Sequence, residues 1–356
     1  MLAAHDIGYP IAKLRRPNAL RDRNAYFLDR RAKIILEPSA KDRRDDAFYE
    51  NNKETLASAC KKHGTILLSD ERLWYEGASR KGFWETIKKL LEPYDFSDIQ
   101  IVLYLRRQDQ FVTSLWSQFV KGKTRESRPL EQYMLNEKIG AVLDYDRGIA
   151  RIEETFGAEN ITVRIFNRKL FPGGDVVHDF CDCVGFDFFE EFSAPKQREN
   201  PSLTNRAAYL KNLINRGTYA RKVDNVFSHP ALTAGALEEE RDRRPYLSYE
   251  QSISLLERYE KGNARIAREY FGRKDGVLFN APSPDMGHFT DTLGQTEIDA
   301  LMMLSEALCL ERQQREELQA RVDELERKLN SNTSDKDSRS IAHLKRGLKR
   351  RMKHGN

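Results

Sequence analysis

The sequence predicts an α/β protein in which a parallel sheet is flanked by helices and followed by a helical, coiled-coil extension. Two observations carry this prediction. Short apolar runs rich in β-branched residues alternate with segments of helical periodicity across the first 280 residues, a pattern typical of parallel α/β sheets. Beyond residue 295 the apolar residues recur in heptads instead, which is typical of a coiled coil.

Three segments are predicted to be buried parallel strands, because each is a short apolar run preceded by polar or turn residues. They are Thr65–Ser69, Ile99–Leu105 and Ile161–Phe166, and Ile34–Leu36 is a weaker fourth candidate.

Helical patterns lie between and after these strands. The clearest has Phe111, Leu115 and Phe119 at i, i+4 and i+8, with Asp109 placed to cap its amino end. The predicted helices cover residues 53–62, 83–91, 109–120, 148–156, 175–184, 204–215 and 249–270.

Composition sets the domain boundaries. We expect the α/β domain at 1–280, a Pro- and Gly-rich linker at 281–295, a coiled coil at 296–330 and a polar, then basic, tail at 331–356. The heptad places Leu301, Leu308, Val322 and Leu329 at a, and Leu304, Leu318 and Leu325 at d. Glu311 and Arg315 interrupt this seam. Residues 296–329 therefore predict a homo-oligomer, the alternative being one amphipathic helix lying on the domain.

The net charge of +5 belongs to the end of the chain. From Lys336 to Asn356 there are eight basic side chains and one acid, a net charge of +7, so the first 335 residues carry −2. Leucine and isoleucine recur at helical spacing among these bases, which suits a helix at an anionic membrane surface. A solvated, disordered tail is the alternative. No aromatic residue follows Phe289, which argues against nucleic acid as a partner.

Composition and residue spacing argue against disulfide-rich, metal-binding and membrane-spanning proteins. The four cysteines are too scattered for a disulfide framework, and the seven histidines show no metal-ligand spacing. We therefore expect no metal. No apolar run reaches the roughly 20 residues that span a bilayer. These features predict a cytoplasmic protein, with peripheral contact to the inner membrane face through the tail.

The segment from Tyr104 to Phe119 carries the strongest chemical signal. Arg106 follows a buried strand at its carboxyl end, and Ser114 lies in the second turn of the next helix. Ligands of parallel α/β sheets bind at this edge, and an arginine there binds a phosphate through two hydrogen bonds. The alternative is that Arg106 and Arg107 pair with neighbouring acids.

The spacing of Arg106 and Ser114 resembles the 3′-phosphate-binding motif of the bacterial sulfotransferase family. These enzymes use 3′-phosphoadenosine-5′-phosphosulfate (PAPS) and have a P-loop NTPase-like fold. Four further segments resemble the family in order, at residues 66–74, 151–171, 199–215 and 259–279. The resemblance implies that Arg106 and Ser114 hold the 3′-phosphate. It also places Arg198, Asn200, Ser202 and the stretch Asn215–Gly217 near the nucleotide, without assigned roles.

One family feature is missing from the sequence. The family begins with a strand and a P-loop-like turn that holds the 5′-phosphosulfate, whereas Met1 begins where the following helix would end. The Gly122-Lys123-Thr124 triplet is a poor substitute, since Ser117 stands where the Walker pattern needs glycine. Either the chain is truncated or it is a degenerate relative that lost catalysis. Losing a central strand exposes two sheet edges unless Met1–Tyr9 or a partner pairs with them, which favours truncation.

Glu71 is the predicted catalytic base. It lies just beyond the strand Thr65–Ser69, and sulfuryl transfer needs the acceptor hydroxyl to lose a proton. Some glycan sulfotransferases resemble this layout. Asp70 is the rival candidate, and a helix-capping or ion-paired glutamate is the structural alternative.

The resemblance implies an enzyme that transfers a sulfuryl group from PAPS to a hydroxyl, on a bacterial carbohydrate acceptor. A second hypothesis is an inactive, sulfotransferase-like scaffold that oligomerises through its coiled coil. A nucleotide kinase is a weaker third, because it needs the same missing loop.

Overall fold

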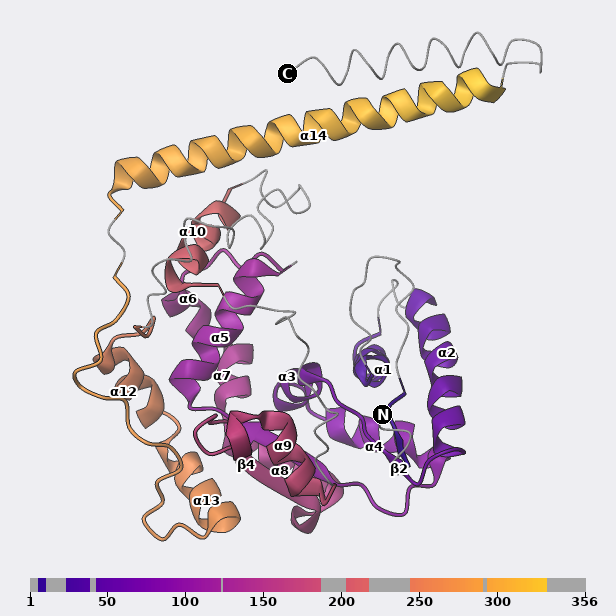
Figure 1. Ribbon diagram of the computed structural model, residues 1–356, viewed down its shortest axis with the longest axis vertical. Coiled ribbons are helices and arrows are strands. Elements are labelled where there is room, and N and C mark those ends of the chain that lie inside the picture. The colour runs from indigo at the N-terminus through magenta and orange to yellow at the C-terminus, as the bar shows by residue number, and fades with distance from the viewer. Residues whose placement is uncertain are drawn as a thin grey trace. The chain divides into compact units, whose positions relative to one another are not determined.

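The computed structural model describes residues 6–10, 24–38, 43–122, 124–186, 203–217, 244–290 and 293–331. It is an α/β structure with parallel strands, flanking helices and a long C-terminal helix (Figure 1). The chain divides into two compact units. Unit 1 comprises Met1–Phe119, Arg128–Arg206 and Glu240–Thr290, and unit 2 comprises Val120–Ser127, Ala207–Glu239 and Asp291–Asn356. Neither unit is one continuous stretch of the chain.

The described strands form two parallel ladders within unit 1. β1 (Ile7–Gly8) pairs with β2 (Thr65–Ile66), and β3 (Ile101–Leu105) pairs with β4 (Ile161–Ile165). The predicted strands at 99–105 and 161–166 are confirmed with slightly shorter bounds, whereas the one predicted at Thr65–Ser69 is regular only over its first two residues. Part of the Met1–Tyr9 segment thus supplies a strand beside β2.

A buried asparagine continues the short β1–β2 ladder. The Nδ2 of Asn24 donates to the carbonyl oxygen of Leu67, and its Oδ1 accepts from the amide of Ser69, both at 2.6 Å. The Leu67 amide donates to the Gly8 carbonyl oxygen. In a parallel strand, successive residues point their amides to opposite edges. The amides of Ile66 and Leu68 therefore point away from β1. The Asn24 side chain therefore acts as a peptide group where β1 has ended.

Helices and short 3-10 turns account for most of the remaining described residues. Up to β3 these are α1 (Tyr26–Leu36), α2 (Arg43–Cys60), α3 (Glu71–Ser79), α4 (Phe83–Leu91) and η2 (Glu92–Tyr94). Between β3 and β4 lie α5 (Gln108–Lys121), α6 (Leu130–Met134), α7 (Glu137–Leu143), α8 (Tyr145–Phe156) and η3 (Ala158–Asn160). After β4 come η4 (Pro172–Gly174), α9 (Val176–Val184), α10 (Asn205–Asn215), α12 (Tyr249–Glu257), α13 (Glu260–Phe271) and α14 (Gln295–Ser331).

The fourth strand expected at Ile34–Leu36 is wrong, because these residues form the last turn of α1. The helix is amphipathic and buries Phe27, Leu28 and Ala32, so its helical period outweighs the short apolar run at its end. The helix predicted at 249–270 is two helices, separated at Arg258 and Tyr259. The predicted helix at 53–62 is the second half of the longer α2.

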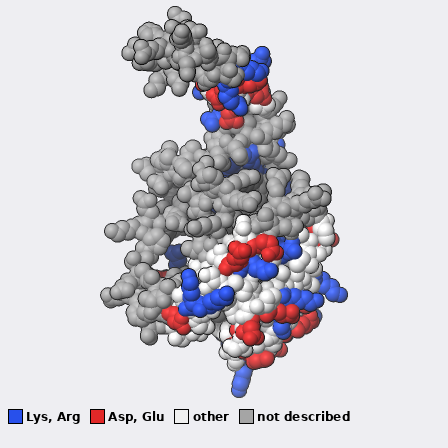
Figure 2. Space-filling model, turned by 90° about the vertical axis from the view of Figure 1, so that its right-hand side faces the viewer, with Lys and Arg blue, Asp and Glu red and all other residues white. Residues whose placement is uncertain are grey.

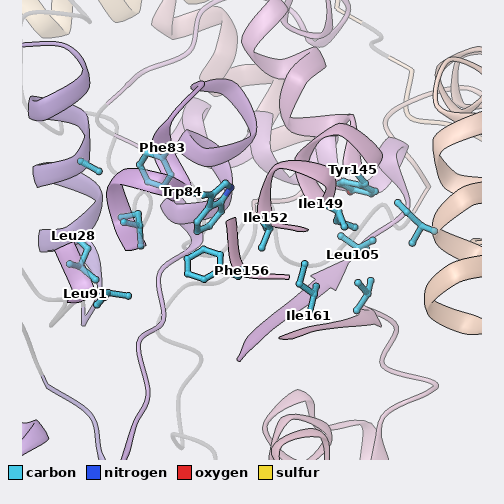
Figure 3. Packing of buried hydrophobic residues seen from close by; sticks show 14 of the residues in the cluster. Leu28, Phe83, Trp84, Leu91, Leu105, Tyr145, Ile149, Ile152, Phe156 and Ile161 are labelled. Atoms are coloured by element: carbon cyan, nitrogen blue, oxygen red, sulfur yellow. The ribbon is translucent and has the colours of Figure 1, made fainter. Parts of the chain in front are cut away.

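The core of unit 1 joins helices to both strands of the β3–β4 ladder. In α4 and α8, the rings of Phe83 and Trp84 have centroids 5.4 Å apart, and those of Trp84 and Phe156 are 6.3 Å apart, both edge-on (Figure 3). Ile149 and Ile152 of α8 are fully buried in the same cluster as Leu105 of β3. This packing fixes the carboxyl end of β3, where the predicted site begins.

Unit 2 is held together by buried amides. The Nδ2 of Asn215 on α10 donates to the carbonyl oxygens of Val120 and Glu126, and that of Asn212 also donates to Glu126. These bonds satisfy carbonyls at and beyond the end of α5 that have no partner within a helix. Both asparagines are buried. They therefore join α10 to the segment that follows α5.

Candidate functional site

The backbone of Arg106 is fixed between β3 and α5. Its carbonyl oxygen accepts a 2.6 Å hydrogen bond from the hydroxyl of Tyr145, a buried residue at the start of α8. The Tyr145 ring packs against Trp74 and Phe111, at centroid distances of 5.8 and 6.3 Å. Core residues from three helices therefore set the direction in which the chain leaves β3.

The two arginines at this junction have different partners. Arg107 donates to both carboxylate oxygens of Asp109 at 2.8 Å and to the carbonyl oxygen of Asn280 at 2.9 Å. Arg106 donates from Nε to the neutral Oε1 of Gln110 at 3.2 Å. Among the described residues, no carboxylate lies within ion-pairing distance of the Arg106 guanidinium. Arg107 therefore follows the surface-pairing alternative, and Arg106 does not.

The surroundings of Arg106 accumulate positive charge. Burial lowers the pKa of its guanidinium below the ordinary value, the nearby Asp109 opposes this, and the charges of Arg168 and Arg107 reinforce it. An arginine stays protonated at any pH that a protein meets. The junction therefore holds a cation that is only partly compensated, which an anion would stabilise.

Ser114 lies on a polar stripe along α5, which we define as Gln110, Ser114 and Gln118. The three residues are spaced at i, i+4 and i+8 and so share one face of the helix. Ser114 is exposed, and Gln110 is the residue that contacts Arg106. The stripe therefore begins beside Arg106, the residue predicted to bind the phosphate.

Glu71 meets the other end of the polar stripe. It is the first residue of α3, and its Oε1 accepts a 2.9 Å hydrogen bond from the Nε2 of Gln118. Gln118 lies one turn beyond Ser114. The structure thus brings all three predicted residues, Arg106, Ser114 and Glu71, to a single helix face. Gln110 and Gln118 were not singled out from sequence, although their spacing of four from Ser114 is a signal that could have found them.

The rival base, Asp70, has a structural role. Its side chain caps α3 by accepting a 2.9 Å hydrogen bond from the amide of Arg72. A capping carboxylate is committed to the helix end. Glu71, by contrast, is exposed and directed to the polar stripe.

Buried ion pairs hold α3 in place. Glu76 is 1% exposed and accepts hydrogen bonds from Arg72, Arg80 and Lys138 at 2.6–3.1 Å, with Lys33 at 4.0 Å. Burial acts to raise the pKa of Glu76, but the hydrogen bonds from Arg80 and Lys138 outweigh it and hold the pKa below its ordinary value. Basic side chains from α1, α3 and α7 therefore converge on one carboxylate.

Arg72 links this cluster to α1. Its Nε donates to Asp29 at 2.9 Å, and Asp29 is fully buried. Burial raises the pKa of Asp29, while the charge and hydrogen bond of Arg72 oppose the rise. No motif in the sequence singles out these residues. They position the helix that carries Glu71.

The remaining predicted residues are not part of the site described above. Arg198, Asn200 and Ser202 fall outside the described residues, as does the basic tail. Asn215 binds backbone carbonyls in unit 2. The triplet at 122–124 follows the carboxyl end of α5, where a helix presents carbonyl oxygens rather than amides to a ligand.

Charge and composition limit the chemistry of the described residues. Acidic and basic side chains are interspersed on the face shown in Figure 2. No group of histidine, cysteine or acidic residues in the described ranges has the arrangement of a metal site. All four cysteines are free thiols. A search of the helices in the described ranges found none with the length and apolarity to cross a membrane.

Comparisons with known proteins give one informative match. The chain is 29% identical over 197 residues to a protein of Archaeoglobus fulgidus that is described as an uncharacterized protein. The match covers 54% of this chain and 53% of the archaeal protein, so it spans about half the length of each. No family model matches the chain, and no solved structure matches it.

Proposed function

We propose that the end of β3 and the polar stripe of α5 bind a nucleotide phosphate, and that the chain transfers a sulfuryl group from PAPS to a hydroxyl. The observation that carries the proposal is the placement of Arg106, a cation without a carboxylate partner among the described residues. It contacts Gln110 at the start of the helix face that leads to Glu71. A P-loop NTPase-like sulfotransferase fold is part of the same proposal, supported by the parallel β3–β4 ladder and its flanking helices.

Each of the three residues has a chemical role in this proposal. Arg106 would hold the 3′-phosphate through two charge-assisted hydrogen bonds, with Ser114 donating to the same group. Glu71, exposed and free of a cationic partner among the described residues, would accept the proton of the acceptor hydroxyl. By family resemblance the acceptor is a carbohydrate, and the basic tail would hold the protein at an anionic membrane surface.

The donor fits the described residues only in part. Arg106 and Ser114 suit a phosphate monoester, but no described loop offers a row of amides and a lysine for the 5′-phosphosulfate. The Gly122 region presents the wrong end of a helix. We therefore assign no step at the sulfur atom to these residues.

This partial fit favours a second candidate function, a nucleotide-binding protein without transferase activity. It would keep Arg106 and Ser114 as ligands of the 3′-phosphate and use α14 for assembly. Such a scaffold differs from the enzyme in one measurable respect, because it would bind a 3′-phosphorylated nucleotide and transfer nothing.

Calorimetry with 3′,5′-adenosine bisphosphate tests the shared part of both candidates. We expect Arg106→Ala to weaken binding roughly 10- to 100-fold, the usual loss for a hydrogen bond to a charged group. Arg147→Ala, which removes an exposed arginine from α8, is the matched control and should bind as wild type does. Adenosine 5′-monophosphate should bind as weakly to wild type as the bisphosphate does to the Arg106 variant.

Absence of bisphosphate binding to wild type would reject the nucleotide site. If the bisphosphate binds, transfer of labelled sulfate from PAPS to carbohydrate acceptors separates the enzyme from the scaffold. Loss of that transfer in Glu71→Gln, with binding intact, would identify the base.

A further inference from the structure

The C-terminal helix carries an apolar seam that is exposed. Leu304, Leu308, Leu318 and Leu325 are 65%, 51%, 66% and 58% exposed along α14. They fall at positions a and d of one heptad frame, together with the half-buried Leu301 and Val322. We call these six residues, with Glu311 and Arg315 at the d and a positions between them, the seam. Leucines at a and d of a single helix gain stability only when a second helix covers them.

The opposite face of α14 is already occupied within unit 2. Ser305 and Cys309 are 2% and 1% exposed. Glu306 approaches Gly217, and Cys309 lies near enough to Lys211 of α10 for the lysine to affect its pKa. Glu306 and Cys309 belong to heptad positions f and b, on the far side of the helix from the seam, and Ser305 belongs to position e, beside it. The helix therefore docks on its own unit by one face and presents the seam outwards.

Two charged residues interrupt the middle of the seam. They determine the orientation in which a second helix can pack against it. Glu311 takes a d position and Arg315 an a position, and within one helix they form a 3.1 Å ion pair. In a parallel, in-register dimer, d meets d and a meets a. Two glutamates and two arginines would then face each other inside the interface, where like charges are costly.

We infer that α14 pairs with α14 of a second copy of the chain in antiparallel orientation, with the two-fold axis at the level of Gln313. In an antiparallel pair, each a position meets a d position of the partner. Glu311 then faces the partner's Arg315, and Arg315 faces the partner's Glu311. The same register sets Leu308 against the partner's Leu318.

The outer layers match in the same register. Leu304 meets the partner's Val322, and Leu301 meets the partner's Leu325. Between Leu301 and Leu325, every layer outside the charged centre is therefore apolar on both sides, over a helix length of about 36 Å. Of the flanking positions, Gln314 meets the partner's Gln314. Arg312 meets its own copy, but it is already paired with Glu316 at 2.7 Å.

The mass of the full-length protein tests whether the seam is an interface. Sedimentation velocity should give a dimer, and Leu308→Asp should raise the dimer dissociation constant at least tenfold. Leu310→Asp is the matched control, because Leu310 is an exposed leucine of the same helix at position c. It introduces the same charge outside the seam and should leave the dimer intact.

The orientation is tested by spin labels on α14, in a background with the four native cysteines replaced. Labels at Lys328→Cys should lie about 45 Å apart along the axis in the antiparallel dimer. In a parallel dimer they would lie side by side, since packed helices are about 10 Å apart. Labels at Gln314→Cys should be close in either orientation, which controls for labelling and assembly.

Three outcomes would overturn the inference. The first is a monomer at all concentrations, and the second is a short distance between the labels at position 328. The third is a full-length monomer that becomes a dimer when residues 332–356 are removed, since the tail of the same chain would then be the occupant of the seam. None of these outcomes depends on nucleotide binding, so the inference stands or falls apart from the proposed function.

Discussion

Two arginines, Arg72 in the first turn of α3 and Arg106 at the carboxyl end of β3, show how a fold separates a structural cation from an available one. Both are partly buried, and burial alone would lower the pKa of each. Arg72 is compensated by Asp29 and Glu76, and its pKa is raised overall. Arg106 has a neutral glutamine as its hydrogen-bond partner, and its pKa is lowered.

The difference lies in what surrounds each charge rather than in the residue type. A cation fully matched by carboxylates contributes to packing and has little to offer a ligand. A cation held by an amide has no carboxylate paired with it, so an incoming anion would complete its charge pairing. The following predictions test this distinction, beginning with the change expected to have the largest effect.

Glu76→Gln should cost about 3–5 kcal/mol of unfolding free energy, because it leaves several basic side chains around a buried neutral amide. Urea denaturation at neutral pH measures the change. Glu85→Gln, an exposed glutamate at the start of α4, should change the stability by less than about 0.5 kcal/mol. Equal losses in the two variants would mean that the cluster around Glu76 contributes nothing special.

Arg72→Met should destabilise by about 3 kcal/mol, since Asp29 is fully buried and would lose its partner. Arg106→Met should change the unfolding free energy by less than about 1 kcal/mol, because no described carboxylate depends on it. Paired denaturation curves compare them directly. A larger loss at position 106 than at position 72 would reverse the assignment of structural and available cations.

Lys211 extends the contrast to unit 2, because this buried lysine donates to the neutral Oδ1 of Asn215 at 2.5 Å. Burial lowers its pKa to about 8, with the charge of Arg125 adding to the effect. The unfolded chain then binds the proton more tightly than the folded one. Stability from this group is therefore lowest below pH 8 and rises as the pH passes from about 8 to about 10.4.

Lys211→Met should therefore stabilise the protein at pH 7 by about 2 kcal/mol, allowing about 1 kcal/mol for the lost hydrogen bond. The gain should shrink as the pH approaches 10. Thermal melts of both proteins across this range check the result. A pH-independent difference would show that the lysine is not desolvated in the folded state.

Glu71→Gln should have the smallest effect on stability, less than about 0.5 kcal/mol, because Glu71 is exposed and its contact with Gln118 survives as an amide pair. Its expected effect is on chemistry, through the loss of a proton acceptor. Circular dichroism melts check the stability. A large destabilisation would assign Glu71 to the structural group with Asp70.

The sequence predicted the strands β3 and β4 and the helix α5 because local pattern and tertiary packing agree there. The strand prediction was wrong at Ile34–Leu36, where three apolar residues resemble a strand but form the last turn of α1. The shortening of β2 was not predictable, since the side chain of the distant Asn24 takes over its hydrogen bonds.

The sequence singles out the residues of the candidate site, but it does not indicate which of them have charged partners. Arg106 and Arg107 are adjacent and look alike in sequence. They differ in that Arg107 takes both the nearby Asp109 carboxylate and the carbonyl oxygen of the distant Asn280. Glu76 lies in a helix rich in charged residues, where an acid is ordinarily solvated. Its burial depends on Lys33 and Lys138, which lie far from it in the chain.

The polar stripe of α5 also sets a fixed distance between its two ends. A helix is stiff, and the eight residues from Gln110 to Gln118 fix about 12 Å between the side chain that contacts Arg106 and the one that contacts Glu71. A small anion such as sulfate reaches only one end. A ligand that contacts both ends of the stripe must span about 12 Å. The helix therefore selects ligands by their length as well as by their charge and shape.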